Sequence, residues 1–121
     1  QEGSTIVTVG SDLGVRPIPE RIGYCPSKAG VIMLTKCIAL EFAPHIRANA
    51  ILPGLVRTPM IEQRFTEAED PAALEESYAS LYPLHKMGKI EDMANAIAFL
   101  SSDESGFITG EIMQVCGGSL I

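Results

Sequence analysis

The chain has 121 residues, 46% of them hydrophobic, and its nine basic and fifteen acidic side chains give a formal charge of −6. This much apolar material can form a single hydrophobic core. The negative charge repels nucleic acid and anionic lipid, so neither is expected as a partner. No apolar run approaches the roughly 20 residues needed to cross a bilayer, so the sequence predicts a soluble, cytoplasmic protein without membrane contact.

Cysteine and histidine provide no pattern typical of a metal site. Cys25, Cys37 and Cys116 form no C-x-x-C pair, so we expect free thiols, buried or half-buried, instead of a disulfide framework or zinc ligands. His45 and His85 stand alone, without a second histidine or a cysteine at helical spacing. The sequence therefore predicts no metal.

The first two predicted elements are a strand over 5–9 and a helix over about 25–45. The strand is short, rich in β-branched residues and bounded by glycines, which is typical of a buried position. The helix has Pro26 in its first turn and Pro44 at its end. Apolar residues lie on nearly every side of it, so we expect one side to pack on a sheet and another to meet a second subunit.

A second strand is predicted over 48–52, followed by a polar segment and a last strand over 111–116. Two helices are expected between these strands. One starts with Asp70 as N-cap and Pro71 as N1 and reaches about Tyr82. The other has Glu91 and Asp92 in its first turn and an apolar row of Met93, Ile97 and Leu100. The order of elements predicts an α/β fold with a parallel sheet and right-handed crossovers.

Four features follow the carboxyl ends of the first two strands. These are Ser11, Tyr24 and the pair Pro53-Gly54. In open parallel sheets, ligands bind in the crevice beyond these strand ends. The sequence therefore predicts a site at this edge.

Tyr24 and Lys28 are four residues apart in YCPSKAG, which on a helix puts both side chains on one face. A lysine charge favours tyrosinate and so lowers a phenol pKa from its usual value near 10. Such a phenol can exchange a proton with a carbonyl or an alcohol. The Y-x-x-x-K spacing occurs often by chance and, taken alone, favours a solvated helix surface, so the hypothesis depends on its combination with Ser11 and Pro53-Gly54.

Several segments in order resemble the short-chain dehydrogenases/reductases. GSTIVTVGSDLG is similar to the strand that ends in the catalytic serine, YCPSKAG to the active-site helix, and IRANAILPGLVRTPM to the strand and cofactor loop. The segment from PLHKMGKIEDM to QVCGG resembles the closing helix and strand. The resemblance covers nearly the whole chain and implies a Rossmann-like parallel sheet with flanking helices.

The resemblance also implies roles for individual residues. Tyr24 would be the general acid/base, Lys28 would bind the nicotinamide ribose, and Ser11 would orient the substrate oxygen. The residues expected to border the nicotinamide half of NAD or NADP, besides Tyr24 and Lys28, are Pro53, Gly54, Val56 and Thr58. The region from Met60 to about Leu84 would cover a small alcohol or carbonyl substrate. Separately, the apolar residues around helix 25–42 predict a homo-oligomer formed through that helix.

The sequence departs from the family pattern in a missing segment and in two single residues. The glycine-rich turn that binds the pyrophosphate does not occur in 1–121, so the sequence predicts only the C-terminal half of the doubly wound domain. His85 stands where glycine is frequent in the family, and Cys116 replaces a common aspartate. Without the earlier strands, the edge of strand 5–9 would be unpaired and prone to aggregation.

Three hypotheses for the function remain. The first is an NAD(P)-dependent oxidoreductase. The second is a catalytically inactive, truncated fragment that acts only in self-association or partner binding. The third is a relative that uses the same tyrosine and lysine for epimerisation or dehydration of a nucleotide sugar. The closing segment FITGEIMQVCGG disfavours the third, since those relatives usually have a longer substrate domain.

Overall fold

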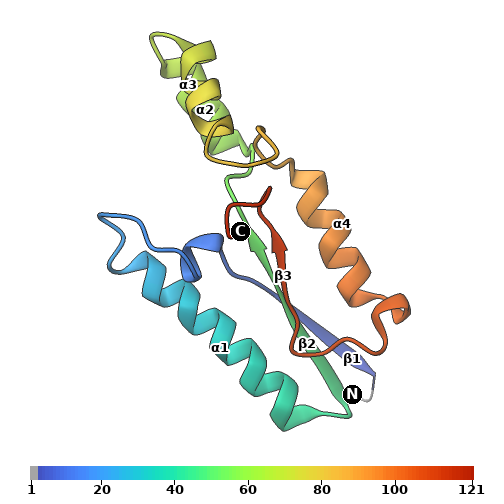
Figure 1. Cartoon of the computed structure of the whole chain (residues 1–121). Helices are drawn as coiled ribbons and strands as arrows, with labels where there is room; N and C mark the ends of the chain where they lie inside the picture. The colour runs from blue at the N-terminus through green and yellow to red at the C-terminus, as the bar shows by residue number, and fades with distance from the viewer. Residues whose placement is uncertain (1–2) are drawn as a thin grey trace.

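The computed structural model describes residues 3–121, which form three strands, four α-helices and two 3₁₀ turns (Figure 1). The α/β class and the order of elements predicted from the sequence are confirmed. One helix was expected only as part of a polar segment, namely Pro59–Glu67. The elements in chain order are β1 (Ser4–Val9), η1 (Asp12–Gly14), α1 (Tyr24–Phe42), β2 (Ile46–Pro53), α2 (Pro59–Glu67), α3 (Pro71–Ala79), α4 (Ile90–Ser101), η2 (Asp103–Ser105) and β3 (Ile112–Val115).

The three strands form one parallel sheet in the order β1-β2-β3. In its register Ser4 pairs with Ile46 and Val9 with Ile51, whereas Pro53 pairs with Val115. β2 is the central strand and is buried over most of its length, as its small and aliphatic sequence favours. All three carboxyl ends therefore lie at one edge, as predicted.

The two long helices cover opposite faces of the sheet (Figure 1). Thr8 of β1 hydrogen-bonds Thr35 of α1, with 2.6 Å between their hydroxyl oxygens. Arg47 points to the other face and donates to the carbonyl of Leu100 at the end of α4, at 3.4 Å. The sheet order β1-β2-β3 means that both connections step across the sheet in the same direction. Two such connections that pass over opposite faces of the sheet have opposite hands. The prediction of right-handed crossovers throughout is therefore wrong for one of them.

The physical reason lies in the connection from β2 to β3. A right-handed crossover is favoured when a strand leads directly through a helix into its neighbour. Here the chain first leaves the sheet to form α2 and α3 and returns only afterwards through α4 (Figure 1). This long detour removes the geometric constraint that a short crossover would impose.

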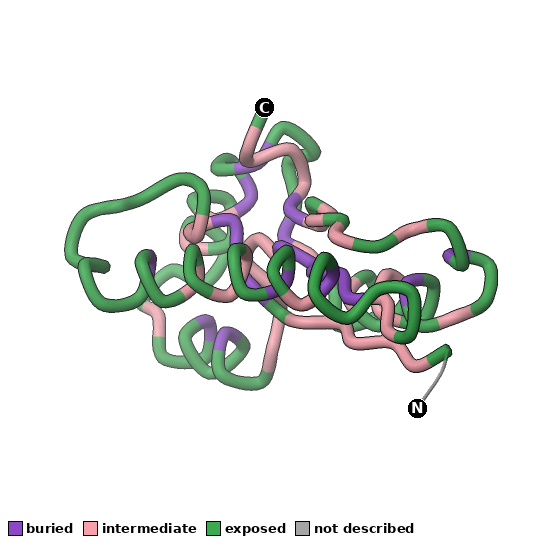
Figure 2. The backbone as a smooth tube through the Cα atoms, turned by 90° about the horizontal axis from the view of Figure 1, so that it is seen from below, coloured by how far each residue is buried: buried purple, intermediate pink, exposed green. Residues whose placement is uncertain are grey.

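α1 presents a large apolar surface to solvent in the described chain. Its buried positions are few, namely Cys25, Thr35 and Ala39. Met33, Leu34 and Leu40 are exposed, Leu40 to 85%. Figure 2 shows how little of the helix surface is buried compared with the central strand. One side of α1 lies on the sheet, as expected. The contact with a second subunit that was expected on another side stays a prediction.

α2 and α3 form a separate layer that extends beyond the carboxyl edge of the sheet (Figure 1). Their own small core consists of Ile61, Phe65 and Met87, against which Leu74 and Tyr78 pack. The predicted start of α3 is confirmed, since the Asp70 carboxylate accepts from the Ala73 N–H at 3.1 Å and Pro71 follows it. The helix ends at Ala79, before the expected Tyr82.

Within residues 3–121, both outer edges of the sheet lack a neighbouring strand. The edge of β1 is thus unpaired in this part of the chain, as predicted. Over the same residues, no helix combines the length and apolar character needed to cross a membrane.

Candidate active site

Tyr24 and Lys28 lie on one face of the first turns of α1, as the sequence predicts. The Lys28 ammonium is 5.8 Å from the centroid of the Tyr24 ring. It also donates to the main-chain carbonyl of Val9 at 3.3 Å. Val9 is the last residue of β1, so this bond holds the lysine at the carboxyl edge of the sheet. The Tyr24 side is open to solvent, with 44% of the residue exposed.

Ser11 follows β1 directly and caps the short helix η1. Its hydroxyl oxygen accepts from the Leu13 N–H at 3.1 Å and its hydroxyl donates to the Asp12 carboxylate at 3.3 Å. Ser11 is buried. Capping a turn is an ordinary structural role for a serine. A substrate oxygen would have to replace Asp12 as the acceptor of the Ser11 hydroxyl proton.

Gly14 explains how η1 lies so close to α1. A Cβ at Gly14 would be 2.9 Å from the carbonyl carbon of Lys28 and 3.0 Å from the nitrogen of Ala29. Both are main-chain atoms and cannot move aside. The absence of a side chain therefore lets the turn that contains Ser11 pack directly on the helix that carries Tyr24 and Lys28.

Asp12 is a buried carboxylate that the sequence interpretation did not single out. Its Oδ2 accepts from the Ser119 hydroxyl at 2.7 Å and lies 3.9 Å from the Arg16 guanidinium. The residue joins Ser11 to the C-terminal turn across the carboxyl edge. An acidic residue in a glycine-flanked turn provides no sequence signal for such a long-range contact.

The second predicted group, Pro53 to Thr58, lies at the end of β2. The Gly10 N–H donates to the Ile51 carbonyl at 2.9 Å, which joins the ends of β1 and β2. Gly54 has no room for a side chain, since a Cβ there would be 2.9 Å from Cε1 of Tyr82. Thr58 is the N-cap of α2, and its hydroxyl accepts from the Ile61 N–H at 3.4 Å.

Val56 is held by Gly88, a residue far along the chain. The Gly88 N–H donates to the Leu55 carbonyl at 2.9 Å, and the Arg57 N–H donates to the Gly88 carbonyl at 2.8 Å. In this parallel bridge the N–H and C=O of Val56 itself point to the opposite edge of the segment. The Val56 carbonyl accepts from the Thr58 N–H at 2.8 Å.

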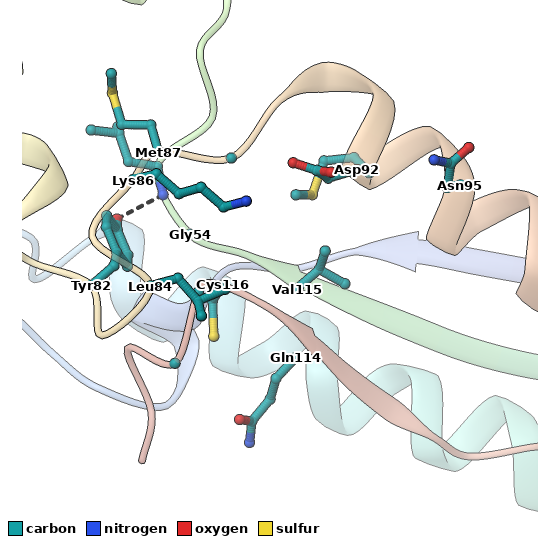
Figure 3. Close-up of a pocket in the computed structure, with 15 residues that line it drawn as sticks. Gly54, Tyr82, Leu84, Lys86, Met87, Asp92, Asn95, Gln114, Val115 and Cys116 are labelled. Atoms are coloured by element: carbon teal, nitrogen blue, oxygen red, sulfur yellow. Dashed lines mark hydrogen bonds between the residues drawn. The ribbon is translucent and has the colours of Figure 1, made fainter.

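Tyr82 is the most buried tyrosine of the chain and was missed in the sequence interpretation. Its hydroxyl oxygen accepts from the Leu55 N–H at 2.7 Å (Figure 3). Burial raises the pKa of Tyr82 above its usual value near 10, the bond from Leu55 lowers it, and the Asp12 carboxylate raises it. The phenol is therefore neutral at physiological pH.

A cavity of about 450 Å³ lies beside Tyr82, between the ends of β2 and β3 and the first turns of α4 (Figure 3). Its wall includes Gly54, Lys86, Asp92 and Cys116, but none of Ser11, Tyr24 and Lys28. A second cavity, of about 460 Å³, lies under loop 13–22 and against Cys25 and Ala29 of α1. Ser11, Tyr24 and Lys28 therefore line neither cavity.

Arg57 connects the end of the β2 loop to both helices of the outer layer. It forms ion pairs with Glu62 of α2 and with Glu75 of α3, the latter at 2.7 Å, and its guanidinium lies 5.1 Å from the centroid of the Phe65 ring. The hydrogen bonds that Arg57 donates to the carboxylates of Glu62 and, next in size, Glu75 raise the pKa of Arg57 above its usual value. The arginine stays charged at every physiological pH.

The three cysteines are free thiols, Cys25 and Cys116 buried as expected and Cys37 exposed against expectation. Cys37 is exposed because it lies on the outer side of α1, away from the sheet. Among residues 3–121, no group of three or more His, Cys, Asp or Glu side chains is arranged to hold a metal ion.

The parallel sheet, the helices on both faces and the polar residues at the carboxyl edge define an α/β protein with a Rossmann-like half-domain. A family model described as enoyl-(acyl carrier protein) reductase matches residues 1–119. The chain is 41% identical to a 3-oxoacyl-[acyl-carrier-protein] reductase of Thermotoga maritima, covering 100% of this chain and 47% of the relative. It is 43% identical to a 4-formylbenzenesulfonate dehydrogenase of Comamonas testosteroni, covering 98% and 47%.

Solved structures agree with these sequence comparisons. ElxO with NADP bound superposes with a TM-score of 0.89 at 36% identity, over 96% of this chain and 46% of that one. This chain belongs to the short-chain dehydrogenase/reductase family, and the resemblance predicted from its motifs is confirmed. The chain spans about half the length of the curated relatives it matches.

Proposed function

We propose that this chain is the C-terminal half of a Rossmann-fold domain in an NAD(P)-dependent oxidoreductase that interconverts an alcohol and a carbonyl. The observation that carries this proposal is the position of Lys28, which bonds the last carbonyl of β1 while its ammonium lies 5.8 Å from the Tyr24 ring centroid. This arrangement puts a phenol beside a fixed positive charge at the edge where α/β sheets bind ligands.

The residues present fit a nicotinamide cofactor. Lys28 uses one of its three donors on Val9, so two remain for the hydroxyls of a ribose. The N–H of Val56 points away from Gly88 and is a suitable donor for the carboxamide. Pro53, Gly54 and Thr58 complete this side of the proposed site. When bound, the nicotinamide supplies or accepts the hydride.

The chain's own residues then transfer the proton and stabilise the negative charge that its transfer leaves. In the direction of reduction, the Tyr24 hydroxyl gives its proton to the carbonyl oxygen as the carbonyl carbon receives the hydride. The Lys28 charge stabilises the tyrosinate that remains. Ser11 turns its hydroxyl from Asp12 to the same substrate oxygen and orients it. The region from Met60 to Leu84 covers the substrate.

The test is Tyr24→Phe in the native protein, with Tyr78→Phe as the matched control, because Tyr78 lies in α3 and packs on Phe65. NADH and NADPH binding is followed by nicotinamide fluorescence. Turnover is measured with 3-oxoacyl thioesters, hydroxysteroids and aromatic aldehydes, the chemical classes in the names of the relatives. Tyr24→Phe should lower turnover at least about 100-fold and leave cofactor binding in place. Unchanged turnover would sink the proposal.

A second candidate function is association without catalysis. It is supported by the exposed apolar residues of α1, among them Met33, Leu34 and Leu40, and by the outer edge of β1. The same helix would join subunits in a homo-oligomeric enzyme. Light scattering after size exclusion distinguishes the cases: a monomer with a cooperative thermal transition contradicts association through α1.

A cytoplasmic location is part of the same proposal. It is supported by three free cysteines, one of them exposed on α1, since reduced thiols are typical of a reducing compartment.

A further inference from the structure

The buried Tyr82 contacts the ends of two strands at once. A Cβ at Gly54 would be 2.9 Å from its Cε1 and 3.3 Å from its Cζ, and a Cβ at Gly117 would be 3.3 Å from its Cβ. Gly117 has a φ of +58°, a conformation that L side chains rarely adopt. The ring therefore fills the space that the glycines leave at the ends of β2 and β3.

The hydroxyl of Tyr82 fixes the first peptide of loop 53–58. It accepts from the Leu55 N–H at 2.7 Å, so it sets the plane of the peptide that joins Gly54 to Leu55 (Figure 3). Burial raises the pKa of Tyr82, and the phenol keeps its proton while it accepts this bond. The contact is therefore independent of pH through the physiological range.

The next peptides of the loop are fixed by the same returning segment. Tyr82 and Gly88 both belong to the stretch that leads from α3 to α4. Gly88 bonds the Leu55 carbonyl at 2.9 Å and the Arg57 N–H at 2.8 Å. Three hydrogen bonds thus pin the segment Leu55–Arg57 from one side, while the N–H of Val56 points to the other side.

We propose that Tyr82 is a positioning residue for nicotinamide binding: its phenol oxygen holds loop 53–58 in the conformation that presents Val56 to the cofactor. This inference rests on the function proposed above. Tyr82 touches neither Tyr24 nor Lys28 in any recorded hydrogen bond or ring contact, so it acts through the loop and not on the reacting atoms.

The experiment compares Tyr82→Phe with Tyr78→Phe in the native protein. Both variants remove one phenol oxygen from the region after α2, but only Tyr82 contacts loop 53–58. Loss of one hydrogen bond should raise the Kd for NADPH or NADH about 3- to 10-fold in Tyr82→Phe and leave Tyr78→Phe within about 2-fold of the parent. Turnover at saturating cofactor should change by less than about 3-fold.

A second readout separates positioning from a purely structural role. Bound cofactor raises the midpoint of thermal unfolding by an amount that grows with the logarithm of its affinity. We expect this rise to be smaller in Tyr82→Phe than in the parent protein and in Tyr78→Phe. An equal rise in all three proteins, with equal Kd values, overturns the inference even if Tyr82→Phe is less stable.

The remaining outcomes are also decisive. If the parent protein binds cofactor and loses turnover in Tyr24→Phe but not affinity in Tyr82→Phe, the function stands and the role of Tyr82 is wrong. If the parent binds neither NADH nor NADPH, the proposed function itself fails. Should Tyr82→Phe not fold, hydrogen exchange of the parent decides: rapid exchange of the Leu55 amide before cofactor is added contradicts a preformed loop.

Discussion

The two sides of the carboxyl edge are held together by different physical means. On the side of β1, η1 packs main chain against main chain on α1 at Gly14, and Lys28 bonds the last carbonyl of β1. On the side of β2, the outer layer of α2 and α3 has its own small core and reaches the sheet through Arg57, Tyr82 and Gly88. The β1 side is rigid because the main-chain atoms that touch at Gly14 cannot move aside. The β2 side can vary in sequence while the proposed catalytic residues stay in place.

This contrast suggests a division of labour. A proton-transfer site requires positions fixed to a fraction of an ångström, which close main-chain packing provides. A substrate cover has to fit different molecules in different relatives, which include enzymes named for acyl-carrier-protein, hydroxysteroid and sulfonated aromatic substrates. Changes on the two sides should therefore affect different kinetic parameters.

The largest expected effect is on the rigid side, with Gly14→Val. The new side chain meets the main chain of Lys28 and Ala29, so η1 has to move away from α1 and take Ser11 with it. Overpacking of this kind costs about 1–3 kcal/mol of unfolding free energy. Displacing Ser11 by about 1 Å should lower turnover about 100-fold. Urea unfolding and steady-state kinetics measure both.

Gly30→Ala is the matched control on α1. A Cβ at Gly30 has no heavy atom within 4 Å, so the substitution should gain up to about 1 kcal/mol in helix propensity and leave turnover unchanged. If Gly14→Val turned over like Gly30→Ala, the packing of η1 on α1 would not position the site.

A smaller effect is expected on the variable side, with Arg57→Gln. Its ion pairs with Glu62 and Glu75 are partly exposed, so the loss should cost less than about 1 kcal/mol of unfolding free energy. The outer layer would lose its fixed angle to the sheet, and we expect KM for the carbonyl substrate to rise several-fold, with kcat within about 2-fold.

Salt and a second arginine sharpen this test. Because exposed ion pairs are screened by salt, the KM and the unfolding free energy of the parent protein in about 1 M NaCl should approach those of Arg57→Gln. Arg64→Gln removes an arginine from α2 without touching either pair with Arg57, and it should behave as the parent. A fall in kcat with unchanged KM would contradict the proposed division between the two sides.

The smallest effect is expected at His85, which stands at φ +52° and is hydrogen-bonded to Glu76, with 2.9 Å between Nε2 and Oε1. His85→Gly relieves a left-handed conformation that costs an L residue about 1 kcal/mol and removes an exposed pair worth less. Unfolding free energy should rise by a few tenths to about 1 kcal/mol. Glu76→Gln removes the pair alone and should lower it by less than about 0.5 kcal/mol. A fall in the unfolding free energy of His85→Gly would show that the left-handed backbone conformation is not the dominant cost at this position.

Local patterns in the amino-acid sequence predicted the three strands and three of the four helices in order, the α3 N-cap at Asp70 and the shared face of Tyr24 and Lys28. These are local properties, fixed by turn residues, strand composition and helical spacing within a few positions. The positions of Ser11 and Pro53-Gly54 after the strand ends predicted a site at that edge, and the resemblance to the family added Val56 and Thr58.

Which distant residues hold that edge together depends on the packing of the whole fold. The contact of Asp12 with Ser119, the phenol of Tyr82 on Leu55 and the bridge of Val56 to Gly88 all join positions far apart in the chain. The hand of the crossovers was also decided at this level, because α1 and α4 cover opposite faces. Long-range contacts of this kind depend on how whole elements pack, and no local pattern of residues encodes them.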